Sequence, residues 1–504
     1  MIKCICDLLD KNVLSNGEKI AFKEINRSIT FNDFQMRSYS ISTFLCKWER
    51  DSIVIFIDKG IDALCSMIGA VGSNNYYTVM DVNTPKNRII DIISQLEPKV
   101  ILTTKKYESI LKDFQIENYI CLEDINDNVD KKLLLNRRNN LIDTDSMYVL
   151  FTSGSTGSPK GVVVSHKALL SYIEWFIEEF KIDNNTVFGS QTPLYFSMSV
   201  SDVFSTIVLG ATMCLIPKMY FSFPIKLIEY LNNEKVNTIY WVPSALSIIY
   251  NFKALDQLKM NYINKILFAG EVMPMKVLNY FRSQLPSVKY FNLFGPTETT
   301  DICTFYTVDK KFEDYDVLPI GKHCNNVDVI ILKDDNTEAL GEESGELCVR
   351  GSFLASGYYK NTQKTSEVFI QNPLNNYYPE VIYKTGDIVK YNSEGELIYL
   401  SRKDFQIKHM GYRIELGEIE AKAGSIDGIS SVACIYDNLN DEIILYFVST
   451  VIEKNDVLLS LVSLLPKYMI PSKVIRIESM PYNSNGKINR SVLKEKGENK
   501  VCKN

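Results

Sequence analysis

The sequence has little of what several classes of protein require. Its 504 residues contain only three histidines, His166, His323 and His409, and no pair of them has the spacing of a metal-binding motif. A zinc site is therefore not expected. The formal net charge at pH 7 is -6, and without an excess of basic residues nucleic acid is not expected as the main partner.

Long apolar runs and paired cysteines are also missing. No uninterrupted apolar stretch reaches the length that crosses a membrane, and the N-terminal stretch M-I-K-C-I-C-D-L-L-D lacks the apolar core of a signal peptide. The eleven cysteines show no paired framework, which is typical of reduced, buried thiols in the cytosol. These absences predict a soluble, cytoplasmic protein with no membrane partner.

The sequence does have the composition and the alternating pattern of an α/β enzyme. Hydrophobic residues make up 46% of the chain and charged residues 23%, as in ordinary globular proteins. The apolar runs at residues 52–57, 76–81 and 100–103 predict buried strands, with helical patterns between them. Such alternation predicts a mostly parallel sheet with helices on its faces.

The most distinctive stretch, residues 148–166, reads Y-V-L-F-T-S-G-S-T-G-S-P-K-G-V-V-V-S-H. Its apolar start predicts a buried strand that runs into a loop of glycines and hydroxyl side chains with one cation, Lys160. Glycines let backbone N–H groups turn toward a ligand, and such a concavity suits phosphate oxygens. The spacing is not that of a Walker A loop, and a plain flexible turn would not need so particular an order of residues.

Three further motifs place single charged residues on glycine turns. N-L-F-G-P-T-E-T-T (residues 292–300) presents Glu298 between hydroxyls, and Mg²⁺ prefers a carboxylate together with phosphate oxygens and water. Y-K-T-G-D (383–387) places Asp387 where its carboxylate can accept hydrogen bonds from vicinal hydroxyls. N-S-N-G-K-I-N-R, near the C-terminus, carries Lys487. Alone, these residues could be a helix-start acid, a turn aspartate and an exposed hairpin lysine.

Taken in order, these blocks and G-E-L-C-V-R-G (345–351) resemble the adenylate-forming superfamily, which includes acyl-CoA synthetases, luciferases and the adenylation enzymes of carrier-protein systems. The resemblance implies a large α/β N-terminal domain of layered sheets and helices, residues 1–402. It also implies a small α+β lid domain, residues 403–504, that rotates about a hinge at Asp404. Gly411 would lie where the family's pantetheine arm passes.

The resemblance further implies ATP and Mg²⁺ as cofactors. Glu298 would hold the metal, and Glu298, Lys160 and Lys487 would be the catalytic residues. Asp387, assisted by Arg402, would hold the ribose. The implied ATP-binding residues are Thr152, Ser153, Gly154, Ser155, Thr156, Gly157, Lys160, Asn292, Phe294, Gly295, Thr297, Asp387 and Arg402.

The implied reaction has two halves. A carboxylate attacks the α-phosphate of ATP to give an acyl adenylate and pyrophosphate, and a thiol then attacks that anhydride to give a thioester and AMP. The lid motifs Q-I-K-H-M-G-Y-R-I-E-L-G-E-I-E and Y-M-I-P-S-K look most like nonribosomal peptide adenylation domains and stand-alone D-alanine–carrier protein ligases. The expected acceptor is a phosphopantetheine thiol on a separate carrier protein. Free CoA, as in acyl-CoA synthetases, and a non-catalytic binding relative are the alternatives.

The predicted acid pocket departs from this pattern at one position. Amino-acid activators carry an aspartate after the motif phenylalanine, Phe196, and it pairs with the substrate's α-ammonium, whereas this chain has Ser197. A buried ammonium without its partner would lose about 3–5 kcal/mol, so an ordinary α-amino acid is not favoured. Phe196 is either a gating aromatic or part of the core. The remaining pocket positions implied by the resemblance are Met198, Ser201, Tyr240, Leu267, Ala269, Leu293, Asp301 and Ile302.

Asp301 leaves two hypotheses for the substrate, a small carboxylic or amino acid. Either Asp301 anchors an amine placed elsewhere on the substrate, as in a β- or ω-amino acid, or the substrate is an aryl or hydroxy acid without an amine. In the second case Asp301 would be a solvated acid beside the metal site.

Overall fold

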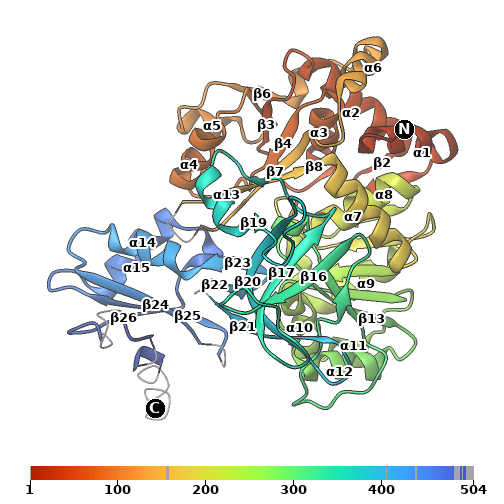
Figure 1. Cartoon of the computed structure of the whole chain (residues 1–504). Coiled ribbons are helices and arrows are strands. Elements are labelled where there is room, and N and C mark those ends of the chain that lie inside the picture. Colours follow the sequence, from red (N-terminus) through yellow and green to blue (C-terminus); the bar gives the residue numbers. More distant parts are fainter. Residues whose placement is uncertain are drawn as a thin grey trace. The chain divides into compact units, whose positions relative to one another are not determined.

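The computed structural model describes residues 2–154, 158–403, 406–437, 440–481, 488–490 and 492–494. The chain forms two compact units (Figure 1). The first contains Met1–Val82, Leu96–Leu150 and Gly161–Lys403, and the second contains Asn83–Gln95, Phe151–Lys160 and Asp404–Asn504. Two short segments from the N-terminal part of the sequence thus group with the C-terminal part. The division at 402/403 stays a prediction.

The first unit contains a seven-stranded sheet with its strands in the order β18-β8-β7-β4-β3-β5-β6. All neighbours from β7 to β6 are parallel, which confirms the predicted parallel sheet. The strands are β3 (Ser52–Ile55), β4 (Tyr76–Val79), β5 (Val100–Thr103), β6 (Tyr119–Cys121), β7 (Ser146–Thr152), β8 (Lys160–Ser165) and β18 (Gly357–Tyr358). The first two end two residues earlier than the apolar runs predicted.

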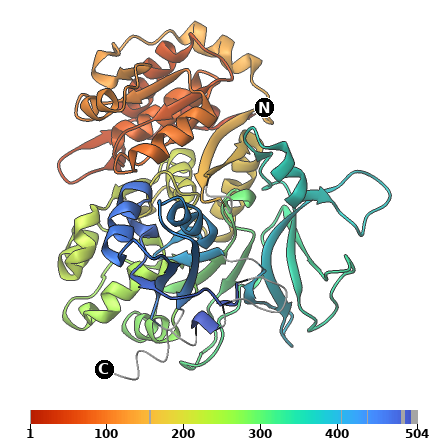
Figure 2. The same ribbon diagram turned by 90° about the vertical axis from the view of Figure 1, so that its left-hand side faces the viewer.

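Helices lie beside this sheet in both ribbon views (Figure 1, Figure 2). They are α1 (Ile5–Asn16), α2 (Phe31–Leu45), α3 (Ile61–Gly72), α5 (Glu108–Asp113) and α6 (Lys131–Asn140). Helix α4 (Lys86–Leu96) belongs almost wholly to the second unit. Almost all of α3 is buried, and it packs closely on α2 because Gly69 has no side chain. A Cβ there would lie 2.5 Å from Cγ2 of Ile41.

A nine-stranded sheet follows, in the order β15-β14-β13-β12-β11-β9-β10-β1-β2, and it is parallel from β13 to β1. Its strands are β1 (Ile20–Lys23), β2 (Ser28–Thr30), β9 (Val187–Ser190), β10 (Thr212–Leu215), β11 (Thr238–Trp241), β12 (Lys265–Phe268), β13 (Lys289–Phe294), β14 (Thr304–Thr307) and β15 (Lys322–His323). The associated helices are α7 (His166–Glu179), α8 (Ser199–Leu209), α9 (Pro224–Asn233), α10 (Pro243–Asn251), α11 (Ala254–Gln257) and α12 (Met275–Gln284).

The third sheet of the first unit is antiparallel, with β16-β17-β20-β19 in order and β21 paired with β20. These elements are β16 (Val327–Leu332), β17 (Gly345–Gly351), α13 (Thr362–Val368), β19 (Phe369–Gln371), β20 (Val381–Tyr391) and β21 (Leu397–Arg402). The G-E-L-C-V-R-G block at 345–351 coincides with β17.

The second unit has its own apolar core, built from α14, α15 and the strands beside them. Its C-terminal elements are β22 (Gln406–His409), β23 (Tyr412–Glu415), α14 (Leu416–Gly424), β24 (Ser431–Asp437), β25 (Glu442–Val448), α15 (Lys454–Leu464) and β26 (Lys473–Arg476). Tyr412 stacks on Tyr468 with ring centroids 3.7 Å apart. This mixture of small sheets and helices is the predicted α+β content.

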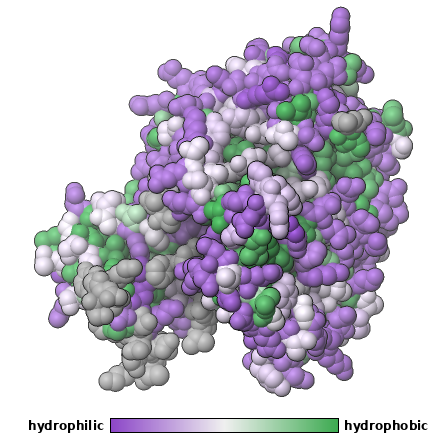
Figure 3. All heavy atoms as spheres, in the orientation of Figure 1, coloured by the Kyte–Doolittle hydropathy of each residue, from purple (hydrophilic) through white to green (hydrophobic). Residues whose placement is uncertain are grey.

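Side-chain burial agrees with the expectation for the cysteines. Ten cysteines lie in the described part of the chain, and all ten are buried free thiols. The face seen in Figure 3 is mostly hydrophilic, with apolar side chains in separate groups. Within the described ranges, no helix has both the length and the hydropathy to cross a membrane.

Candidate active site

Glu298 lies in a short 3₁₀ turn directly after β13. It has no exposed surface, and the Tyr358 hydroxyl donates a hydrogen bond to its Oε1 at 2.7 Å. The N–H of Ala355 donates to the Glu298 carbonyl at 2.8 Å, so backbone and side chain are both fixed. A single rigid carboxylate fits Mg²⁺, which is usually held by one or two carboxylates with substrate phosphates and water. Among the described residues there is no cluster of three or more His, Cys, Asp or Glu side chains that could hold a metal by itself.

The glycine before this turn is required by packing. A Cβ on Gly295 would lie 2.4 Å from the Asp301 carbonyl oxygen, 2.5 Å from the Ile302 Cα and 2.7 Å from the Cys303 nitrogen. All three atoms belong to backbone, which cannot move aside as a side chain can. Gly295 therefore lets the Glu298 turn fold back against the segment that carries Asp301.

The other residues predicted around this turn make specific contacts of their own. The Asn292 amide donates to the Pro319 carbonyl at 2.7 Å, and the Phe294 ring lies 5.8 Å from the ring of Tyr399. The Thr297 hydroxyl donates to that of Ser197 at 3.5 Å. Asn292 thus ties β13 to a neighbouring loop, and its contact with ATP stays a prediction, as do those of Phe294 and Thr297.

Asp387 and Arg402 face each other on the neighbouring strands β20 and β21. Arg402 Nη1 donates to Asp387 Oδ1 at 2.9 Å, and Arg402 Nη2 donates to the Thr385 carbonyl at 3.1 Å. The expectation that Asp387 sits on a turn was wrong. Gly386 has φ +77°, and the register of β20 against β17 shifts here, so this glycine forms a β-bulge inside a continuing strand.

Part of the glycine-rich loop belongs to the second unit and contacts β23. The Ser153 hydroxyl donates to the Arg413 carbonyl at 2.8 Å and accepts the N–H of Glu415 at 3.2 Å. The Thr152 hydroxyl is buried and has no hydrogen-bond partner within the described residues. A Cβ on Gly154 would lie 2.1 Å from the Ser158 carbonyl oxygen. Lys160 begins β8, and Ser155, Thr156 and Gly157 lie outside the described residues.

Arg88 and Glu418, which the sequence did not single out, form a buried ion pair in the second unit. Burial raises the pKa of the Glu418 carboxyl, while Arg88 and the Gly154 backbone N–H act in the opposite direction. Gly411 lies at the tip of the β22–β23 hairpin, where it and Met410 both have positive φ, as type I′ turns require. Lys487 and Asp404 lie outside the described residues, so their predicted roles stay predictions.

The predicted acid pocket centres on Asp301, which is 2% exposed. Its Oδ2 accepts hydrogen bonds from the hydroxyls of Tyr172 at 3.0 Å, Tyr240 at 3.1 Å and Ser201 at 3.3 Å. Burial raises the pKa of Asp301 to about 6, and the hydroxyls of Tyr172, Tyr240, Ser197 and Ser201 limit the rise. The hypothesis of a solvated Asp301 was therefore wrong, because three elements, α7, α8 and β11, enclose the side chain.

The other predicted pocket residues fall into two groups. Phe196 is half-buried and its ring lies 5.1 Å from that of Tyr195, a contact that fits either gating or packing. Tyr172, which was not among the predicted pocket residues, also supplies a donor to Asp301. The buried apolar members are Met198, Leu267, Ala269, Leu293 and Ile302.

A second pair of titratable groups, Lys59 and Asp202, which the sequence analysis missed, lies near the ends of β3 and β9. Asp202 is buried and Lys59 is partly exposed. Lys59 Nζ donates to the carbonyl of Ser190 at 2.9 Å and to its hydroxyl at 3.3 Å. Asp202, on α8, is 1% exposed, and neither carboxyl oxygen has a hydrogen-bond partner among the described residues. Burial raises the pKa of Asp202 to about 8 and lowers that of Lys59 to about 7, and each charge opposes the other's shift. A lysine just after a buried strand was the only sequence sign of this pair.

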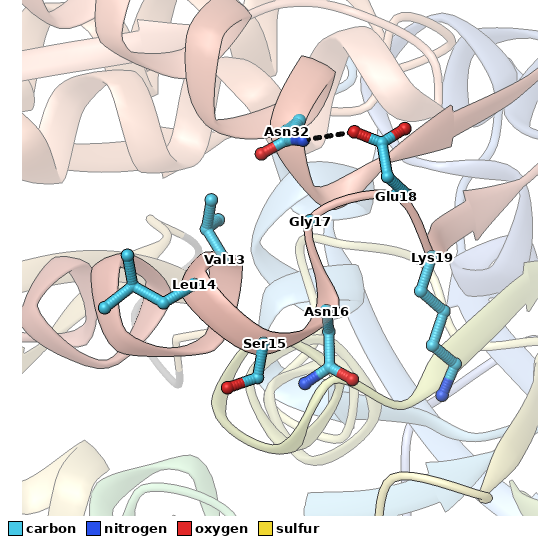
Figure 4. Close-up of a pocket in the computed structure, with 8 residues that line it drawn as sticks. All are labelled: Val13, Leu14, Ser15, Asn16, Gly17, Glu18, Lys19 and Asn32. Atoms are coloured by element: carbon cyan, nitrogen blue, oxygen red, sulfur yellow. Dashed lines mark hydrogen bonds between the residues drawn. The ribbon is translucent and has the colours of Figure 1, made fainter.

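A surface hollow of about 360 Å³ lies elsewhere, at the end of α1 (Figure 4). Asn32 donates to Glu18 across its rim at 2.7 Å, and Lys19 Nζ donates to the Gly210 carbonyl at 2.6 Å. Its polar groups are thus engaged with one another and with the backbone. None of the predicted site residues lines it.

The chain has relatives among known proteins in both sequence and fold. The chain is 29% identical to zwittermicin A synthase ZmaJ of Bacillus cereus, over 99% of this chain and 96% of that protein. It is 28% identical to the D-alanine–D-alanyl carrier protein ligase of Staphylococcus aureus (strain MRSA252), over 95% and 96%. In structure it is similar to the Vibrio cholerae adenylation domain AlmE, solved with glycyl-adenosine-5'-phosphate, with a TM-score of 0.84 at 19% identity, covering 99% of this chain and 98% of that one.

Fold and sequence together define an adenylate-forming ligase. Residues 9–359, more than half of the chain, match the family described as AMP-binding enzyme. The chain belongs to the AMP-binding enzyme family.

Proposed function

We propose that this enzyme uses ATP to convert a small carboxylic or amino acid into an acyl adenylate, and then transfers the acyl group to the phosphopantetheine thiol of a separate carrier protein. The observation that carries the proposal is the buried Glu298, held by Tyr358 in a turn that follows a sheet strand. The relatives of this chain include a D-alanine–D-alanyl carrier protein ligase, which supports a carrier protein as the thiol acceptor.

The first half of the reaction brings two anions together, so positive charge must be placed between them. Mg²⁺, when bound at Glu298, would neutralise phosphate charge. Lys160 would lie beside the phosphates and Lys487 beside the attacking carboxylate. Losing one such preorganised group typically costs about 3–4 kcal/mol, or ~10²–10³ in rate.

Asp387 would hold the ribose through its vicinal hydroxyls. Arg402 already donates to Oδ1 of this carboxylate, which fixes its orientation before the nucleotide arrives. A second carboxylate oxygen is then available in principle for a ribose hydroxyl, because an ionised carboxylate has about four acceptor positions. The remaining ATP contacts are proposed for the glycine-rich loop, residues 152–160, and for the turn from Asn292 to Thr297.

The second half of the reaction needs a different arrangement, because the thiol must reach the acyl carbonyl beside which Lys487 is proposed to lie in the first half. We assign this change to a rotation of the lid domain, residues 403–504, about Asp404, with Gly411 beside the pantetheine arm. Gly411 has φ +79° at a hairpin tip, where the absence of a Cβ also leaves room for a passing chain.

The experiment that tests the first half is ATP–pyrophosphate exchange with a panel of acids. We expect acid-dependent exchange that requires Mg²⁺, and absence of exchange with every acid would overturn the proposal. Lys487→Ala should abolish exchange but spare thioester formation from supplied acyl adenylate. Lys473→Ala, which changes an exposed lysine on β26, is the matched control.

The acceptor is tested separately. Purified acyl adenylate is offered with a phosphopantetheinylated carrier protein or with free CoA, and thioester is quantified by mass spectrometry. Faster transfer to the carrier protein supports the proposal. Faster transfer to free CoA would instead identify an acyl-CoA synthetase.

A further inference from the structure

The buried carboxylate of Asp301 has only neutral partners in the described structure. Its hydrogen-bond donors are the hydroxyls of Tyr172, Tyr240 and Ser201, and no ion pair of Asp301 occurs within the described ranges. With a pKa of about 6, Asp301 is mostly ionised at neutral pH. An ion taken out of water without a counter-charge is strongly disfavoured, so this arrangement is incomplete without a cation.

The Lys59 ammonium is engaged elsewhere. Lys59 donates to Ser190 and is attracted by Asp202, the second buried carboxyl of this region. Asp202 also interacts with Asp301, and the two like charges raise each other's cost of ionisation. Because Lys59 donates to Ser190 and Asp202 keeps its proton up to about pH 8, neither group gives Asp301 a paired charge, and Asp301 can accept a cation from outside the chain.

The surrounding hydroxyls connect Asp301 to the turn that carries Glu298. The Ser197 hydroxyl limits the rise in the pKa of Asp301, and it also accepts a hydrogen bond from the hydroxyl of Thr297 at 3.5 Å. Thr297 directly precedes Glu298 in the 3₁₀ turn. The hydroxyls of Ser197 and Thr297 thus link the buried Asp301 to the turn of Glu298, where phosphate chemistry is proposed. Ser197 itself has no charge.

We propose that Asp301 binds a protonated amine of the acid, so that the substrate is an amine-bearing carboxylic acid whose ammonium docks at Asp301 rather than at residue 197. This inference rests on the proposed function. The protonated amine would neutralise the charge of Asp301. The three N–H groups of the ammonium could donate to the carboxylate and to neighbouring hydroxyl oxygens. A neutral acid would leave Asp301 buried and unpaired, which a site of this kind penalises heavily.

The test compares amino acids that differ in amine position, each paired with its des-amino acid, in pyrophosphate exchange. The readout is the ratio of kcat/KM for each pair in the wild type and in Asp301→Asn. We expect the preferred amino acid to exceed its des-amino partner by roughly 10²–10³-fold, and this ratio to fall below about tenfold in Asp301→Asn. Asp256→Asn, which changes an exposed aspartate that also accepts a tyrosine hydroxyl, should keep the wild-type ratio.

A second variant serves if Asp301→Asn does not fold, which circular dichroism would reveal. Tyr240→Phe removes one hydroxyl that lowers the pKa of Asp301, so the pKa of Asp301 should rise in this variant. As the pH is lowered, amine-dependent exchange should therefore be lost at a higher pH in Tyr240→Phe than in the wild type. The titratable groups that face Asp301 are Tyr172, Tyr240, Tyr148, Asp202 and Cys324, and burial raises the pKa of each, so all remain protonated near pH 6.

The outcomes separate the two proposals. Exchange in which des-amino acids match or exceed amino acids would overturn the role of Asp301 and leave adenylation standing. An unchanged ratio in Asp301→Asn, or an unshifted acid limb in Tyr240→Phe, would do the same. Absence of exchange with every acid would instead overturn the proposed function.

Discussion

The Arg402 guanidinium lies directly across from Asp387 on the next strand of the antiparallel sheet and donates to its Oδ1 at 2.9 Å. Both side chains are almost completely buried, with exposed fractions of 8% and 3%. The same sheet carries a second cross-strand pair, Asp328 with Arg350, which is much more exposed. These two pairs share their chemistry and differ mainly in their contact with water.

Removing the buried arginine should be far more costly than removing the exposed one. Arg402→Leu leaves the Asp387 carboxylate buried without its cation, so we expect the free energy of unfolding to fall by about 3–5 kcal/mol. Arg350→Leu should cost about 0–1 kcal/mol for each of its two ion pairs, with Asp328 and with Glu380, because water already screens the Arg350 guanidinium. Urea denaturation of both variants measures this, and equal losses would contradict the contrast.

The hydroxyl that holds Glu298 should matter for metal-dependent activity. Tyr358→Phe removes the 2.7 Å hydrogen bond, and loss of such an orienting partner typically costs about 10–100-fold in metal affinity or activity. Glu298→Gln should cost more, roughly 10²–10³-fold in rate. Exchange rates measured across a Mg²⁺ titration give both values.

Tyr359→Phe is the control for Tyr358. The Tyr359 hydroxyl contacts the Tyr76 hydroxyl at 2.9 Å and the Leu96 carbonyl at 3.2 Å. Its loss should leave the Mg²⁺ dependence unchanged. If both phenylalanine variants shift the titration alike, the specific role of Tyr358 is lost.

The buried Asp202 should give the protein a defined dependence of stability on pH. The folded state keeps the Asp202 proton up to about pH 8, whereas the unfolded chain releases it near 3.8. Between these values the folded state binds more protons, so this group's contribution makes stability fall as pH rises. Asp202→Asn lacks this contribution, and its unfolding free energy relative to wild type should therefore increase from about pH 4 to pH 8.

Urea denaturation at several pH values in this window measures the difference. Lys59 is retained in the variant, so its own titration near pH 7 will affect the upper part of the curve. Asp256→Asn, which removes an exposed carboxyl, is the control. A flat difference for Asp202→Asn would show that the Asp202 carboxyl ionises normally in the folded protein.

Glycine at position 295 should be irreplaceable. Gly295→Ala drives a Cβ into three backbone atoms, and relieving the overlap should cost about 1–3 kcal/mol and displace the Glu298 turn. Gly424→Ala is the matched control at the end of α14, where the nearest atom, Val432 Cγ1, is 3.5 Å away. Thermal unfolding of both variants should separate them clearly, and a tolerated Gly295→Ala would refute the packing argument.

The motifs of the sequence were enough to predict the sheets and the family, because strand periodicity and short loop motifs are local properties. The parallel pairing of β3, β4 and β5 followed from apolar runs separated by helices. Strand ends were less certain. The runs at 52–57 and 76–81 continue two residues past the strands, although the N–H groups of Phe56 and Met80 still donate to the carbonyls of Leu102 and Ile55 on the neighbouring strands.

The partners of the site residues could not be predicted in the same way. Tyr172 and Asp301 are 129 positions apart, and nothing in the helical pattern around Tyr172 distinguishes a hydroxyl donor from a core aromatic. Lys59, which follows β3 of the seven-stranded sheet, donates to Ser190 at the end of β9 in the nine-stranded sheet. Asp387 was expected on a turn because T-G-D is a common turn sequence, but flanking strand residues carry the chain through a bulge.

If Ser153 donates to the nucleotide, as proposed, its contact with β23 has a consequence for the order of events in catalysis. A serine hydroxyl carries one proton, and in this structure that proton is given to the Arg413 carbonyl. A phosphate oxygen that needs Ser153 as its donor can accept this hydrogen bond only after the bond to the Arg413 carbonyl has broken. Nucleotide capture and retention of the β23 hairpin are then competing uses of a single hydrogen atom.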